Sequence, residues 1–61
     1  GMLILNGVHD GSLVLIYNKA GNMIAHYSEY LDGMGIALPE RGIYIVAVIY
    51  ENDKHVVKVV Y

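Results

Sequence analysis

The sequence predicts a small all-β domain, an antiparallel β-sandwich that is immunoglobulin-like in outline and has about six short strands. Glycines and Asn/Asp pairs divide the chain into short runs rich in Val, Ile, Leu and Tyr. The hydrophobic fraction is 56% and the charged fraction 16%, against roughly 45–50% and about 25% in typical soluble domains. Because a chain of 61 residues has room for only one core, we expect a single domain over residues 1–61.

We expect six strands, each bounded by residues that favour turns. They are Leu3–Asn6, Leu13–Tyr17, Met23–Ser28, Ile36–Leu38, Ile43–Tyr50 and His55–Tyr61. The one candidate for a helix, residues 28–34, contains Gly33 and follows no apolar period, so we expect no helix.

Two hairpins join four of these strands. Asn18–Asn22 separates the second strand from the third, and Gly21 is expected to take a positive φ after a type I turn. Residues 51–54 form a polar connection between the last two strands, which we expect to span all four residues. Both pairs should therefore be antiparallel.

The strand Ile43–Tyr50 is apolar on both faces, which predicts a central position because each face must be covered. The last strand carries Lys58 on an otherwise apolar surface, where a charge limits aggregation. Residues expected to contribute to the buried surface are Leu15, Ile24, Ile43, Ile45, Val46, Val48, Val57 and Val59.

No pattern in the chain indicates a metal or cofactor site. The three histidines are His9, His26 and His55. His9-Asp10 lies in a glycine-flanked turn, but the chain has no His-x-His or His-Glu-x-x-His spacing. Asp32-Gly33 and Asn52-Asp53 do not belong to a run of alternating oxygen ligands. We interpret these acidic pairs as turn formers.

Catalytic motifs are also missing from the sequence, so we expect the chain not to be an enzyme. Ser12 and Ser28 lie in no Gly-x-Ser-x-Gly context. Gly33-Met34-Gly35 is not followed by the Lys and Ser/Thr of a phosphate loop, and we interpret it as a flexible connector.

Charge and hydropathy exclude further classes. The net charge is −2 and the basic residues are scattered, so we expect no nucleic-acid binding. Ile43–Tyr50 is too short for a transmembrane helix, and Leu3–Leu5 is too short for the core of a signal peptide. Gly1 before Met2 is typical of a tag remnant. Met2 is then either a natural start or the first residue of an excised fragment, with a domain incomplete at its N-terminus.

Two stretches resemble a known family. Residues 15–24, Leu-Ile-Tyr-Asn-Lys-Ala-Gly-Asn-Met-Ile, resemble a hairpin of the C-terminal sorting domains that direct Bacteroidetes proteins to the type IX (Por) secretion system. Residues 38–46, Leu-Pro-Glu-Arg-Gly-Ile-Tyr-Ile-Val, resemble that family's Leu-Pro-x-Gly-x-Tyr-x-Val signature with one extra residue before the glycine. Lys58-Val59-Val60 is similar to its closing strand.

The resemblance implies a non-catalytic sorting or attachment module on a larger protein. It implies recognition by secretion machinery and a secreted or cell-surface destination. The motif residues are Gly21, Pro39, Gly42 and Tyr44. Their role is structural, since the glycines free the backbone at strand entries and the proline fixes the chain before a central strand.

The alternative hypothesis is a stand-alone structural or adhesive module that oligomerises through its apolar strands. Without cysteine, a core this small rarely supplies more than about 3–5 kcal/mol, which favours self-association or a neighbouring domain. The candidate interface residues are Val56, Val57, Val59, Val60 and Tyr61. Tyr27 and Tyr30 either form an exposed aromatic patch or, as we expect, pack over the edge of the core.

Overall fold

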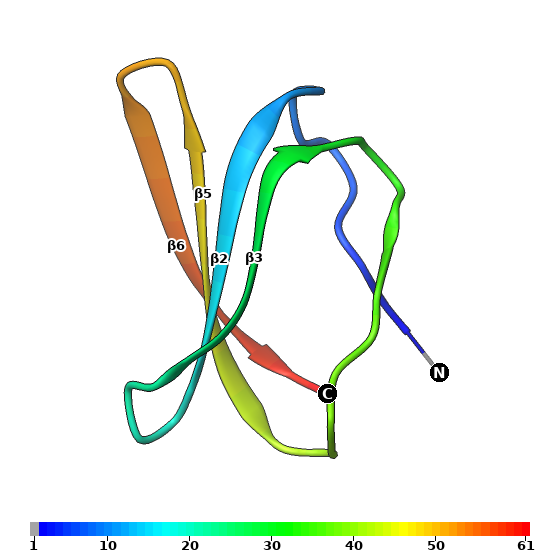
Figure 1. The fold of residues 1–61 in the computed structure, drawn as a ribbon, viewed down its shortest axis with the longest axis vertical. Helices are drawn as coiled ribbons and strands as arrows, with labels where there is room; N and C mark the ends of the chain where they lie inside the picture. Colours follow the sequence, from blue (N-terminus) through cyan, green and yellow to red (C-terminus); the bar gives the residue numbers. More distant parts are fainter. Residues whose placement is uncertain (1) are drawn as a thin grey trace.

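The computed structural model describes residues 2–61 and contains six strands in two antiparallel sheets. The strands are β1 (Leu3–Ile4), β2 (Ser12–Asn18), β3 (Met23–Tyr30), β4 (Gly35–Ile36), β5 (Ile43–Tyr50) and β6 (Asp53–Val60). Four of them form a sheet in the order β3-β2-β5-β6, and β1 pairs with β4 in a small second sheet on one side of it (Figure 1). The predicted small antiparallel β-sandwich is confirmed.

The β2–β3 hairpin is closed by its asparagines and by Gly21. The Asn18 Oδ1 atom accepts hydrogen bonds from the backbone N–H groups of Ala20 and Asn22, both at 3.0 Å. Gly21 has a φ of 88°, as predicted, which a residue with a Cβ adopts only at a cost. The Asn18 side chain thus replaces backbone partners that the turn lacks.

The β5–β6 hairpin is tighter than the sequence indicated. Tyr50 pairs with Asp53, which leaves a turn of only two residues. The expected four-residue connection is wrong, because Asp53 and Lys54 continue the ladder of β6. A two-residue turn requires a positive φ, and Glu51 supplies it at 53°.

Glu51→Gly is therefore expected to stabilise the domain by about 0.5–1 kcal/mol, because it relieves a left-handed conformation that costs a non-glycine residue about 1–2 kcal/mol. Thermal melts should show the midpoint rising by a few degrees. Asn52→Gly is the matched control, because Glu51 is the only non-glycine residue with a positive φ among residues 2–61. That control should be neutral or destabilising, and equal effects of the two changes would contradict the explanation.

The core lies between the two sheets, on the face of the large sheet that we call the inner face. Its fully or almost fully buried apolar side chains are Val14, Ile16, Tyr30, Ile36, Tyr44 and Val46. β5 lies between β2 and β6, so its predicted central position is confirmed. Ile24, Val48 and Val59 also pack against this core, as expected.

Two residues expected in the core are exposed. Ile43 is 39% exposed and Val57 is 48% exposed. Ile43 lies on the opposite face of the large sheet, together with Leu15 and Ile45, whereas Val57 shares the inner face but lies on the edge strand. The prediction was wrong for Ile43 because alternation alone does not say which apolar face the small sheet covers. It was wrong for Val57 because β6 is the edge strand, which the small sheet leaves partly uncovered.

Tyrosine hydroxyl groups hold the connections against the large sheet. The Tyr30 hydroxyl accepts a hydrogen bond from the Leu5 N–H at 3.2 Å and donates one to the Met34 carbonyl. Leu5 directly follows β1 and Met34 directly precedes β4, so this hydroxyl connects both strands of the small sheet to the end of β3. The Tyr44 hydroxyl donates to the Glu40 carbonyl at 2.6 Å, which fixes the entry into β5.

Candidate interaction surfaces

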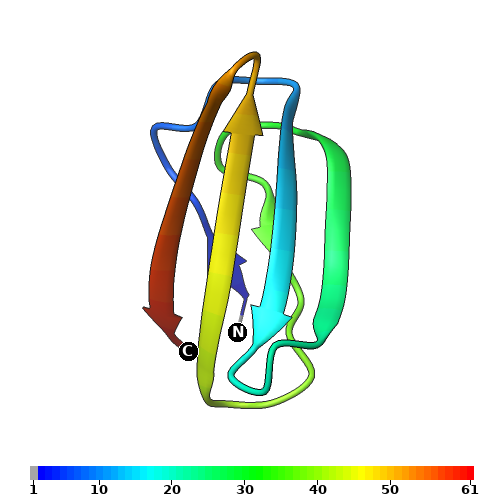
Figure 2. The same cartoon turned by 90° about the vertical axis from the view of Figure 1, so that its left-hand side faces the viewer.

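The face of the large sheet that points away from β1 and β4 is covered by no other strand of the described chain, and we call it the outer face. Figure 2 shows it toward the viewer, with β1 and β4 behind the sheet. The strand registers place nine apolar side chains on it: Leu13, Leu15, Tyr17, Ile43, Ile45, Ala47, Ile49, Val56 and Val60. The outer face is therefore as apolar as the face that forms the core.

Exposure on the outer face rises from its centre to its margin. Ala47 is almost buried by its neighbours, whereas Val56 is 56% and Val60 77% exposed on the edge strand. The polar side chains Lys54 and Lys58 lie on β6, and His26 lies on β3 beside Leu15. Contiguous apolar surface with a polar margin is typical of protein interaction sites.

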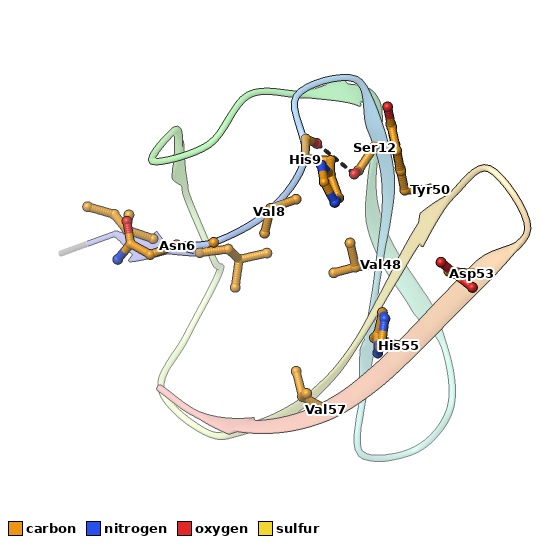
Figure 3. Close-up of a pocket in the computed structure, with 12 residues that line it drawn as sticks. Asn6, Val8, His9, Ser12, Val48, Tyr50, Asp53, His55 and Val57 are labelled. Atoms are coloured by element: carbon orange, nitrogen blue, oxygen red, sulfur yellow. Dashed lines mark hydrogen bonds between the residues drawn. The ribbon is translucent and has the colours of Figure 1, made fainter.

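A groove opens on the opposite side, between the N-terminal segment and the inner face of β5 and β6 (Figure 3). Its volume is about 450 Å³. Val48 and Val57 form an apolar part of the groove wall. His55 and Asp53 make the groove polar at the end that lies near the β5–β6 turn. The groove exists because the small sheet does not close against β6, and this explains the exposure of Val57.

At the upper end of the groove, the His9 ring stacks on Tyr50 with centroids 4.5 Å apart and an interplanar angle of 16°. The Ser12 hydroxyl donates to the His9 carbonyl at 2.7 Å. These contacts fix the loop that leads into β2. The Ser12 hydroxyl thus has a structural partner.

The structure separates the residues considered as metal ligands. His9 and His55 line the groove, whereas His26 lies on the outer face. The carboxylate of Asp10 accepts a hydrogen bond from the Asp32 N–H at 2.8 Å, and that of Asp32 accepts one from the Val8 N–H at 3.0 Å. Asp32-Gly33 lies in a turn, as interpreted, whereas in the other pair only Asn52 does, because Asp53 begins β6. Residues 2–61 contain no group of three or more His, Cys, Asp or Glu side chains arranged to hold a metal.

Of the motif residues, Gly21 lies in the β2–β3 turn, whereas Pro39, Gly42 and Tyr44 lie at the entry into β5. Gly42 exchanges two backbone hydrogen bonds with Tyr61, at 3.1 and 2.8 Å, which extends the β5–β6 ladder by one pair. The Arg41 guanidinium lies 4.9 Å from the centre of the Tyr61 ring, and Tyr44 meets the same ring edge to face. Pro39 lies in the exposed bend just before this cluster.

The five candidate interface residues of the last strand do not form one surface. Val56 and Val60 lie on the outer face, whereas Val57 and Val59 lie on the inner face. Val59 and Tyr61 pack against the core. The interface residues named from the sequence omitted the side chains that β2 and β5 contribute to the outer face, although the doubly apolar run of β5 was a signal for them.

Tyr27 and Tyr30 also differ from each other. Tyr30 is fully buried, which confirms the packing interpretation for this residue and contradicts an exposed aromatic patch. Tyr27 is partly buried against the core and meets Tyr30 edge to face, with ring centroids 6.2 Å apart.

Comparisons with protein-family models, with curated proteins and with solved structures returned no match. Within residues 2–61 there is no helix that would be long and apolar enough to cross a membrane. The outer face and the groove are therefore the features from which a function is inferred.

Proposed function

We propose that this chain is a non-catalytic attachment module that binds a protein surface through the outer face of its large sheet. The observation that carries the proposal is the continuous apolar surface over β2, β5 and β6, with no other strand of residues 2–61 above it. Burying apolar surface stabilises a complex by about 25 cal/mol per Å² before the costs of association. A protein partner fits this surface, since a net charge of −2 does not favour nucleic acid.

The resemblance to type IX sorting domains supports a particular form of this proposal. In that form the module belongs to a larger exported protein, has an immunoglobulin-like outline, and attaches its cargo at the cell surface after recognition by the secretion machinery. Gly21, Pro39, Gly42 and Tyr44 would build the fold, and the outer face would make the attachment.

A reporter fusion tests this proposal. Residues 2–61 would be joined to the C-terminus of an exported fluorescent reporter in a Bacteroidetes host with an active type IX system. We expect surface-bound fluorescence for the wild-type module. The double variant Leu15→Lys/Ile45→Lys should lose surface attachment, because it places charges in the middle of the apolar outer face.

Leu31→Lys is the matched control, because Leu31 is also apolar and 54% exposed but lies between β3 and β4, outside the outer face. It should behave like the wild-type module. A reporter that distributes identically with and without the module would refute the sorting form. Surface attachment that survives the double variant would refute the role of the outer face.

A further inference from the structure

We infer that the partner of the outer face is a second copy of this chain, packed face to face about a two-fold axis that runs parallel to the strands between β2 and β5. This inference rests on the proposed function, because it uses the same surface and names its occupant. Three features support it: the order of side chains across the sheet, the distribution of charge, and the available area.

The strand registers arrange the outer face in rows that cross the sheet. One row runs from Lys54 through Ile49 to Leu13, and it ends at the β-bulge of β3, where Ser28 and Glu29 both lie opposite Leu13. The next row contains Val56, Ala47, Leu15 and His26. The row after that contains Lys58, Ile45, Tyr17 and Met23.

A two-fold axis parallel to the strands places each row opposite the same row of the second copy, with the order of its residues reversed. Ile49 then meets Leu13 of the second copy, and Ala47 meets Leu15, so the apolar centre is self-complementary. Pairing the small Ala47 with the larger Leu15 lets the two layers interdigitate, as in the core of a sandwich. β6 of each copy lies over β3 of the other.

Charge favours this axis over the alternative. Under the parallel axis, Lys54 at one edge of the sheet faces Glu29 at the other edge, twice in each dimer. A two-fold axis perpendicular to the strands lays β6 on β6, which brings Lys54 and Lys58 of both copies together. Like charges placed opposite each other weaken association, so the distribution of charge selects the parallel axis.

The area of the outer face is sufficient for a specific but weak dimer. Four strands of seven or eight residues, spaced about 4.8 Å apart and rising about 3.3 Å per residue, give a flat area of roughly 500 Å² per copy. The pair thus buries roughly 1,000 Å², close to the minimum of about 1,000 Å² for a biological interface. Interfaces of this size are typical of weak, transient complexes, so we expect a dissociation constant in the micromolar range.

The dimer is tested by sedimentation velocity of the purified wild-type protein at concentrations from about 1 µM to about 1 mM, which span the expected dissociation constant. We expect a monomer–dimer equilibrium. Ile45→Lys should weaken dimerisation by about 100-fold or more, because it buries a charge without a partner. Leu31→Lys should leave the equilibrium unchanged. Circular dichroism of each variant separates loss of the dimer from loss of the fold.

A charge exchange tests the axis. Glu29→Lys and Lys54→Glu should each weaken the dimer by about tenfold, whereas the double variant should recover to within about threefold of wild type. Wild-type protein that stays monomeric at about 1 mM would overturn the inference. So would a dimer that is insensitive to Ile45→Lys, and so would additive losses in the charge-exchange pair.

These results are distinguishable from failure of the proposed function. A monomeric chain whose reporter attachment still depends on Leu15 and Ile45 would overturn only the second copy as partner. Attachment and dimerisation that both survive the double variant would overturn the proposed function as well.

Discussion

Tyr30→Phe should lower the free energy of unfolding by about 2 kcal/mol, since loss of the hydroxyl leaves the Leu5 N–H and the Met34 carbonyl without this partner. A core of this size supplies about 3–5 kcal/mol in total. A change confined to one oxygen atom thus removes a large part of the stability. Urea unfolding at one fixed protein concentration, followed by far-ultraviolet circular dichroism, measures the loss.

Tyr27→Phe provides the control for this prediction. The Tyr27 ring contacts Tyr30 and the core, but its hydroxyl has no hydrogen bond within the described residues. We expect a change within about 0.5 kcal/mol for this variant. Equal losses at Tyr27 and Tyr30 would mean that the two hydrogen bonds of Tyr30 do not hold the small sheet in place.

Gly42→Val should destabilise the domain by about 1–3 kcal/mol. Gly42 has a φ of 157°, in a region that only glycine adopts readily, and it exchanges both of its backbone hydrogen bonds with Tyr61. No atom lies within 4 Å of the Cβ that a substitution would add, so the cost arises in the backbone and not from a clash. Thermal melts detect the loss of stability.

Gly42→Ala separates these two causes. If backbone conformation is responsible, alanine should lose most of what valine loses, although its side chain is much smaller. Melting midpoints that stay within about a degree or two of wild type for both variants would show that Gly42 is an ordinary position.

The sequence predicted the strands better than it predicted their faces. Ile43–Tyr50 has the bounds that were expected, and Gly21 closes the β2–β3 hairpin with the expected positive φ. In β2, however, Val14 and Ile16 form the core, whereas the predicted Leu15 lies on the outer face. Both sets of side chains are apolar, so only the position of the small sheet decides which set is buried.

The two short strands and Tyr30 show a second limit of pattern reasoning. Leu3–Asn6 and Ile36–Leu38 were expected as strands, but pairing is confined to Leu3–Ile4 and Gly35–Ile36. The third strand was expected to end at Ser28, whereas a β-bulge at Ser28 and Glu29 lets β3 continue to Tyr30. A bulge depends on the partner strand, and no local pattern identifies it.

The two sheets are joined by few hydrogen bonds, so they also differ in the free energy needed for local unfolding. Long ladders join β2, β3, β5 and β6, whereas β1 and β4 pair over two residues and share the Tyr30 hydroxyl as an anchor. Amide protons of Gly33 and Met34 should therefore exchange with solvent together and before those at the centre of β2 and β5. In that partly open state Val14, Ile16 and Val46 are exposed to solvent. Both faces of the large sheet then present apolar side chains to solvent at the same time. The rate of such openings, rather than the global melting temperature, would then set how long a dilute solution of this protein stays free of aggregates.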